Sequence, residues 1–158
     1  MNDKFYLLKI KLLYVEPTIW RKFVVPAHIP LDRLHDVIQI VMGWEDCHMH
    51  EFTIAKKRYI EEPQSKDEEF EAKHLLNNLI KRKGSKFRYL YDFGDGWEHE
   101  VTLENSRYPI EDMHSMAICL AGERACPPED VGGIPGYLDF YDAMKDPKHP
   151  EYDNYLDW

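Results

Sequence analysis

The sequence has few cysteines and no long apolar run, and both absences limit what the protein can be. Its 158 residues include three cysteines, Cys47, Cys119 and Cys126, no two of which have CxxC spacing. A disulfide scaffold is therefore not expected. No apolar stretch approaches the roughly 18 residues that a membrane-spanning helix needs. Residues 1–14 alternate lysine with apolar residues and do not resemble a signal peptide. These features predict a reduced, cytoplasmic protein without a membrane anchor.

Positive charge is also scarce. The chain has 29 acidic and 20 basic residues, which gives a formal net charge of −9. A negative field of this size repels phosphate backbones and anionic membranes, so direct nucleic-acid binding is disfavoured. Hydrophobic residues make up 44% of the chain, and aromatic residues 13%. This composition is typical of a globular protein with a dense core or an aromatic-lined pocket.

Apolar spacing predicts strands that meet by hairpins, with helices inserted between them. Strands are expected at residues 5–15, 19–25, 48–55, 57–62 and 86–104, and helices at 31–41, at 75–80, from Pro135 and from Pro150. The acidic run 61–72 predicts a solvated loop. The fold class is therefore α+β, a single domain over residues 1–158 with a mainly antiparallel β-sheet and inserted and C-terminal helices packed on it. Because the chain ends at Trp158 within an apolar pattern, we also expect a further C-terminal segment.

The segment 86–104 has the clearest hairpin pattern, and its register can be argued from its faces. A three-residue loop, 94–96, places Phe93 opposite Trp97 and Tyr91 opposite His99. A two-residue turn would mix the apolar and polar faces throughout, because a slip of one residue inverts every side chain. The same register places Asp92 opposite Glu98, with Asp95 at the tip. Facing carboxylates favour a raised pKa or a bound cation, whereas Asp92 and Asp95 can equally satisfy turn amides.

Three histidines are candidates for a metal site. His48 and His50 share one face of their predicted strand, and His99 lies on the apolar face of the hairpin. An H-x-H pair with a third imidazole from a neighbouring strand can bind zinc or another divalent transition metal. The alternative is that each histidine lies at the edge of the core, hydrogen-bonded to a hydroxyl, a carboxylate or a backbone carbonyl.

The loop from Pro127 to Gly133 is rich in proline and glycine, which predicts a stiff, ordered connection. Glu129 and Asp130 within it can accept hydrogen bonds from turn amides or join the rim of a pocket.

Several segments together resemble the plasmid pRiA4b ORF-3-like family. The matching segments are residues 17–22, 34–39, 42–44, 48–52, 91–99, 119–133 and 136–137. The resemblance covers nearly the whole chain and implies an α+β domain. It also implies a link to mobile elements, because family members carry a label relating them to resolvases or insertion-element passenger proteins. The chain itself has neither a serine-recombinase signature nor a basic recognition helix.

The resemblance marks polar and aromatic residues that a core alone does not require, and these imply a shared binding site. Its predicted members are Trp20, Arg21, Trp44, Asp92, Asp95, Trp97, Glu129 and Asp130.

Two functional hypotheses follow. The first is a non-catalytic binding module without a cofactor, which binds a protein partner from mobile-element or DNA-processing systems. The second is a metal-dependent hydrolase with His48, His50 and His99 as ligands. In the second hypothesis Asp92, Glu98 or Glu129 acts as the acid or base.

Overall fold

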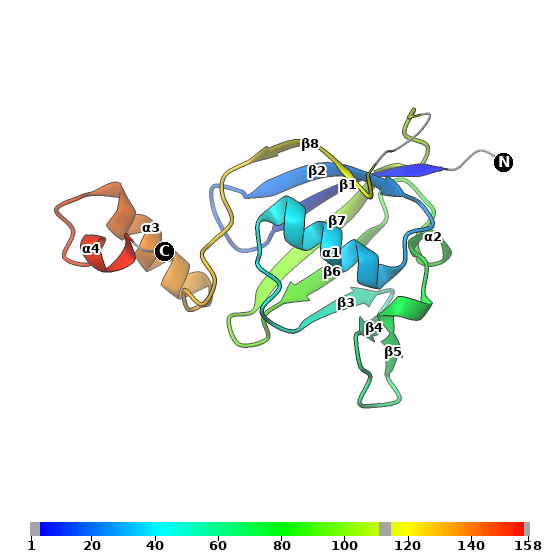
Figure 1. The fold of residues 1–158 in the computed structure, drawn as a ribbon, viewed down its shortest axis with the longest axis horizontal. Helices are drawn as coiled ribbons and strands as arrows, with labels where there is room; N and C mark the ends of the chain where they lie inside the picture. The colour runs from blue at the N-terminus through cyan, green and yellow to red at the C-terminus, as the bar shows by residue number, and fades with distance from the viewer. Residues whose placement is uncertain (1–3, 111–114, 157–158) are drawn as a thin grey trace.

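A mainly antiparallel eight-stranded sheet forms the body of the protein in the computed structural model, which describes residues 4–110 and 115–156 (Figure 1). The strands are β1 (Phe5–Leu12), β2 (Trp20–Pro26), β3 (His50–Ile54), β4 (Lys57–Ile60), β5 (Glu68–Phe70), β6 (Lys86–Tyr91), β7 (Trp97–Asn105) and β8 (Ile118–Glu123). Their order across the sheet is β5-β4-β3-β6-β7-β1-β2-β8. Every neighbouring pair is antiparallel except β4 and β5. The α+β class predicted from the sequence is confirmed.

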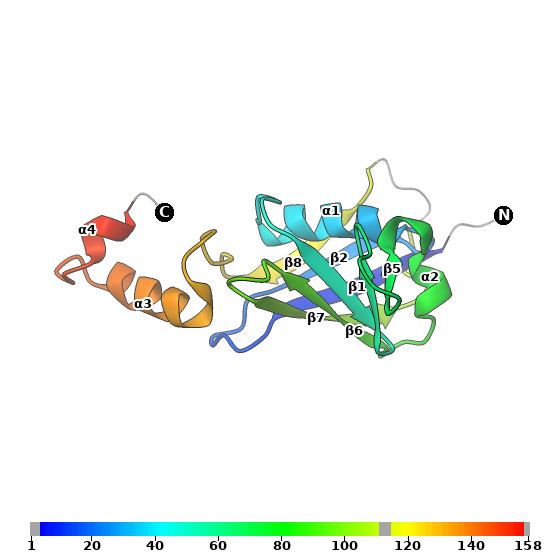
Figure 2. The same cartoon turned by 90° about the horizontal axis from the view of Figure 1, so that it is seen from below.

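One long helix covers one face of this sheet (Figures 1 and 2). The helices are α1 (Leu31–Met42), a short 3₁₀ helix (Glu71–Lys73), α2 (Leu76–Leu79), α3 (Gly133–Lys145) and α4 (Tyr152–Tyr155). Leu31, Leu34 and Ile38 of α1 are fully buried, as their helical spacing predicts. They pack into a core with aromatic side chains of the central strands, such as Phe52 and Tyr89. Among the described residues, no helix has both the length and the apolar character needed to cross a membrane.

The C-terminal helices lie differently from α1. Figure 2 shows α3 and α4 extending beyond one end of the sheet, where the β6–β7 loop lies. Tyr137 of α3 is buried and packs edge-on against Trp97 of β7, with ring centroids 6.4 Å apart. Phe140 of α3 also packs edge-on against Tyr155 of α4, with ring centroids 5.4 Å apart. Trp158, the last residue of the sequence, lies outside the described residues.

The hairpin register differs from the prediction by two residues. Tyr91 lies opposite Trp97, and Leu90 lies opposite Glu98, so the loop has five residues, 92–96. An even shift keeps every side chain on its predicted face, which is why the face argument could not detect it. The cause is Asp92, which leaves the strand with a φ of +64° and caps the loop amides. The predicted Asp92–Glu98 pair therefore does not form.

Two other segments form strands that the sequence did not predict. The acidic run 61–72, predicted as a loop, contains β5 and the start of the 3₁₀ helix, and its Glu71 is only 2% exposed. The connection after residue 117 begins with β8, an edge strand that pairs with β2. Neither strand has an alternating apolar pattern, so each depends on its pairing partner, which is the nearby β4 for β5 and the distant β2 for β8.

Candidate functional site

Three connections meet at the end of the sheet from which α3 extends. They are residues 43–49, which follow α1, the β6–β7 loop 92–96, and residues 124–132, which precede α3. The backbone N–H of Asp92 donates to the carbonyl of Met49 at 2.8 Å, which joins the first two connections. The Asp95 carboxylate accepts the N–H of Gly132 at 3.2 Å, which joins the second and third. Side chains from all three can therefore share one site.

Local backbone requirements fix the first connection. Gly43 ends α1 with a φ of +100° and donates its N–H to the carbonyl of Gln39. A Cβ at this position would lie 3.3 Å from the Cys126 sulfur, so the third connection packs closely here. The next residue, Trp44, is buried, and its indole N–H donates to Nε2 of His99 at 3.2 Å. These contacts hold the chain that leads to His48.

Asp92 fixes the second connection. Its Oδ1 accepts the N–H groups of Gly94 and Asp95 at 3.0 and 3.1 Å, and its carbonyl accepts the N–H of Gly96 at 2.6 Å. Its other oxygen, Oδ2, faces His48. The side chain of Asp92 is therefore held rigidly while one carboxylate oxygen remains available to a ligand.

His48 lies at the centre of an acidic group that we call the His48 cluster, formed by Cys47, His48, Asp92, Glu129 and Asp130. Nε2 of His48 is 2.8 Å from Oδ1 of Asp130, 3.5 Å from Oδ2 of Asp92 and 3.8 Å from Oε2 of Glu129. This nitrogen is buried, yet none of these contacts has the direction of a hydrogen bond. Ligand atoms of the cluster lie within 4.8 Å of one another in two overlapping groups that share His48.

Glu129 is the best oriented carboxylate of the cluster. Its Oε2 accepts the Tyr91 hydroxyl at 3.0 Å and the Cys47 thiol at 3.3 Å, and its Oε1 accepts the N–H of Glu45 at 3.3 Å. Burial raises the pKa of Tyr91, and its contacts with Cys47 and Glu129 contribute. Tyr91 therefore acts as a neutral donor that holds Glu129 in place. A depression of about 470 Å³ lined by Cys47, His48 and Met49 gives access to the cluster.

The chemistry of the cluster suits a divalent transition metal. One imidazole with two or three carboxylates is a common ligand set for zinc, manganese or iron in hydrolytic sites. Calcium and magnesium prefer oxygen ligands alone. His48 and the nearby Cys47 thiol therefore favour the transition metals.

The structure does not bring the three predicted histidine ligands together. His50 is directed to Glu71, with its Nε2 at 2.9 and 2.8 Å from the two carboxylate oxygens. His99 is fully buried, donates from Nδ1 to the carbonyl of Tyr89 at 3.1 Å and accepts the Trp44 indole at Nε2. Burial lowers the pKa of His99 to about 4. His48 precedes β3 instead of belonging to it, so it does not share the face of His50.

Of the three residues expected to supply an acid or base, Asp92 and Glu129 belong to the His48 cluster. Glu98 lies on β7 opposite Leu90 and is not part of either candidate ligand group of the cluster. The structure thus groups one of the three predicted histidines with several carboxylates.

The predicted binding residues separate into three groups. Asp92, Glu129 and Asp130 surround His48, and Asp95 holds the third connection in place. Trp44 and Trp97 are 6% and 0% exposed, so they support the site from the core. Trp20 and Arg21 lie on β2.

Arg21 has a structural role in that position. Its Nε donates to the carbonyl of Val41 at 2.9 Å, and its NH1 donates to the carbonyls of Trp20 and Glu123 at 2.8 and 3.1 Å. These bonds connect the end of α1 to β2 and β8. Lys9 covers the Trp20 ring, with Nζ 5.0 Å from the ring centroid.

A second polar network, which was not predicted from the sequence, lies beneath α1. The Tyr89 hydroxyl donates to Nδ1 of His35 at 2.6 Å, and Nε2 of His35 donates to Asp46 at 2.7 Å. Gln39 closes the ring, since its amide donates to Tyr89 and its oxygen accepts the Asp46 N–H. Burial lowers the pKa of His35, and the neighbouring His50 lowers it further. The helical position of His35 and Gln39 at i and i+4 was the one available signal.

The architecture defines an α+β domain with a polar cluster carried on three connections at one end of its sheet. The chain belongs to the plasmid pRiA4b ORF-3-like protein family, which it matches over residues 4–158. It is 39% identical over 154 residues to an uncharacterized protein of Sinorhizobium fredii, y4hQ, a match covering 96% of this chain and 78% of that protein. The crystal structure of MM3350 from Methanosarcina mazei, a protein of unknown function, is similar with a TM-score of 0.87 and 35% identity. That match covers 100% of this chain and 90% of the other.

Proposed function

We propose that this domain binds one divalent transition-metal ion in the His48 cluster and acts as a metal-dependent hydrolase. The observation that carries the proposal is the buried Nε2 of His48, which has three carboxylates within 3.8 Å and no directed hydrogen bond. A buried imidazole nitrogen normally has a partner. A metal ion between this nitrogen and the carboxylates satisfies all of them at once.

The geometry suggests roles for the individual groups. His48, Asp92 and Asp130 are the proposed ligands, since their donor atoms lie within 4.8 Å of one another. A metal ion held by these ligands would supply Lewis-acid activation of a water molecule for attack on a carbonyl or phosphoryl centre. Glu129, positioned by Tyr91, accepts the proton of that water. The depression beside Cys47 and His48 leaves room for a substrate.

A non-catalytic binding role is the second candidate. It is favoured by two exposed apolar side chains, Met49 and Phe93, which are 67% and 46% exposed and line a pocket of about 600 Å³. A partner from mobile-element or DNA-processing systems, a cytoplasmic location and weak affinity for nucleic acid all stay predictions.

Metal analysis of the untagged full chain, purified without chelators, tests the proposal. We expect near-stoichiometric zinc, manganese or iron by elemental analysis and native mass spectrometry. His48→Ala removes a ligand and is expected to weaken metal binding at least 100-fold, since even supporting residues change affinity 10- to 100-fold. Asp130→Asn is the second variant, because this side chain is 67% exposed and its replacement should not disturb folding.

His28→Ala is the matched control, because His28 is exposed and lies outside the cluster. It should retain the metal content of the parent protein. A folded parent protein that stays empty after incubation with zinc, manganese and iron overturns the proposal. If metal is bound, phosphoester and peptide substrates are the first classes to assay.

A further inference from the structure

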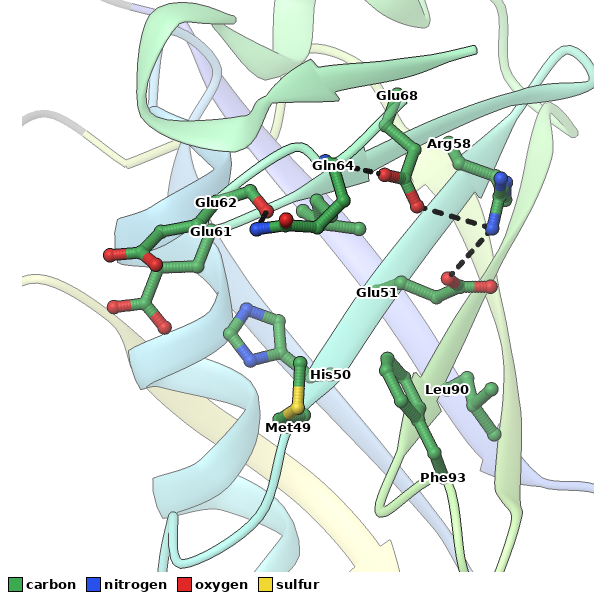
Figure 3. A pocket seen from close by; sticks show the side chains of 11 residues that line it. Met49, His50, Glu51, Arg58, Glu61, Glu62, Gln64, Glu68, Leu90 and Phe93 are labelled. Atoms are coloured by element: carbon green, nitrogen blue, oxygen red, sulfur yellow. Dashed lines mark hydrogen bonds and ion pairs between the residues drawn. The ribbon is translucent and has the colours of Figure 1, made fainter. Parts of the chain in front are cut away.

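A pocket next to the His48 cluster has a different chemistry. It has a volume of about 600 Å³, within the range of small-molecule sites. Strands β3, β4, β5 and β6 and the adjoining loops form it (Figure 3). It shares Met49, His50 and Glu61 with the depression that leads to the cluster.

We propose that this pocket binds a small organic cation, an amine attached to an apolar group. The proposal goes beyond the metal site and does not require a bound metal.

The apolar part of such a ligand has a wall to contact. Met49, Ile60, Leu90 and Phe93 line the pocket, and Figure 3 shows Phe93 and Leu90 across the pocket from Glu61 and Glu62. An exposed aromatic ring beside an acidic group is a favourable surface for a cation with an apolar body. Phe93 and Met49 are 46% and 67% exposed, so both offer apolar surface to a ligand in this pocket.

The charges of the pocket select a cation. Its single arginine, Arg58, is already paired with Glu68 at 3.3 Å and with Glu51 at 3.8 Å. Glu61 and Glu62 remain, and their carboxylates have no ion-pair partner among the described residues. This excess of negative charge repels an anion and attracts an ammonium group.

His50 supplies a hydrogen-bond acceptor in the same place. Its side chain is 5% exposed, and its Nε2 donates to Glu71. In the neutral imidazole the other nitrogen, Nδ1, is then an acceptor. Nδ1 has no hydrogen-bond partner among the described residues although the ring lines the pocket. An ammonium N–H donor satisfies this nitrogen and the Glu61 carboxylate together.

Three probes that share a phenylalkyl group but differ in charge distinguish the effect of charge on binding from that of apolar contact. Phenethylamine, phenethyl alcohol and 3-phenylpropionate carry a positive, a neutral and a negative group on similar phenylalkyl chains. Binding is followed by the ¹³C-methyl resonance of Met49, assigned with Met49→Leu, in the full chain with EDTA present. The readout is therefore independent of the proposed metal.

We expect a saturable shift with phenethylamine, and affinities at least tenfold lower for the alcohol and the carboxylate. The double variant Glu61→Gln/Glu62→Gln should weaken phenethylamine binding about tenfold. Glu16→Gln is the matched control, because Glu16 is exposed and lies outside the pocket. It should change the affinity less than twofold. Phe93→Ala should weaken binding of the amine without unfolding the protein, since the ring is partly exposed.

Equal affinity for the three probes overturns the proposal, as does a Met49 resonance that does not shift at millimolar phenethylamine. Neither result bears on the metal site, which is tested by metal content alone.

Discussion

Glu71 and His50 form a buried hydrogen-bonded pair, with side chains that are 3% and 5% exposed. Glu71 belongs to the acidic run 61–72, and the neighbouring carboxylates of Glu68 and Glu69 are more exposed. The His50 ring also stacks on His35, with centroids 3.4 Å apart and planes 6° from parallel. Glu71 therefore holds the His50 ring, on which the His35 imidazole stacks.

Replacing Glu71 should destabilise the protein far more than replacing its neighbour. Removing one partner of a buried hydrogen bond leaves the other partner unsatisfied and costs about 1–3 kcal/mol, so Glu71→Ala should lower the free energy of unfolding by that order. Glu69→Ala is the control, because Glu69 is 37% exposed and pairs only with surface groups. It should cost about 0.5 kcal/mol or less. Urea denaturation measures both, and equal costs would contradict the buried role of Glu71.

Stability should fall as the pH drops below about 6.5, the ordinary histidine pKa. Burial lowers the pKa of His99 to about 4 and also lowers that of His35. Between the lowered pKa of the folded protein and the ordinary pKa of about 6.5, the unfolded chain binds protons that the folded protein does not. Full stability is therefore present above pH 6.5 and is lost on acidification. For His99 the loss amounts to roughly 3 kcal/mol when complete, at 1.36 kcal/mol per pKa unit.

Urea denaturation between pH 7.5 and 5 measures this slope above the range where most carboxylates titrate. His99→Gln should be less stable at pH 7.5 and should show a shallower loss on acidification. A parent protein whose stability is constant across this interval contradicts the burial of neutral histidines.

Gly133 should be intolerant of a side chain because the third connection packs on the β6–β7 loop there. Its φ is +70°, and a Cβ would lie 2.6 Å from the carbonyl oxygen of Asp95. Gly133→Ala should therefore cost more than the about 1–2 kcal/mol of left-handed strain alone, and should also weaken metal binding by displacing Glu129 and Asp130. Gly84→Ala is the control, since Gly84 has a φ of +92° but nothing within 4 Å of its added Cβ.

Both variants are compared by thermal unfolding and by metal affinity. The Gly84 variant should show the strain cost with unchanged metal binding. Equal unfolding costs for the two variants would contradict the close approach at Gly133.

Metal addition should stabilise the protein through the His48 cluster. A ligand that binds only the folded state at a hundred times its Kd contributes about 2.7 kcal/mol. We therefore expect zinc or manganese to raise the Tm, EDTA to reverse the rise, and His48→Ala to abolish it. The His28→Ala control should respond as the parent protein does. A rise of the same size in His48→Ala would show that the metal binds elsewhere.

The sequence by itself determined the elements whose residues interact locally. The helix at Leu31–Met42 and its glycine stop follow from spacing within one segment, and so do the strands of the 86–104 hairpin. The ordered family motifs also identified the fold class, since they span nearly the whole chain.

Only the tertiary structure decided the contents of the candidate sites. His48, Asp92 and Glu129 come from three different connections. Hydrogen bonds such as Asp92 N–H to the Met49 carbonyl and Gly132 N–H to the Asp95 carboxylate hold these connections together. Glu71 could not be distinguished from its acidic neighbours, because its burial depends on the strand pairing of β4 with β5. Periodicity reports which face a side chain occupies, but the partner that it meets there depends on distant parts of the chain.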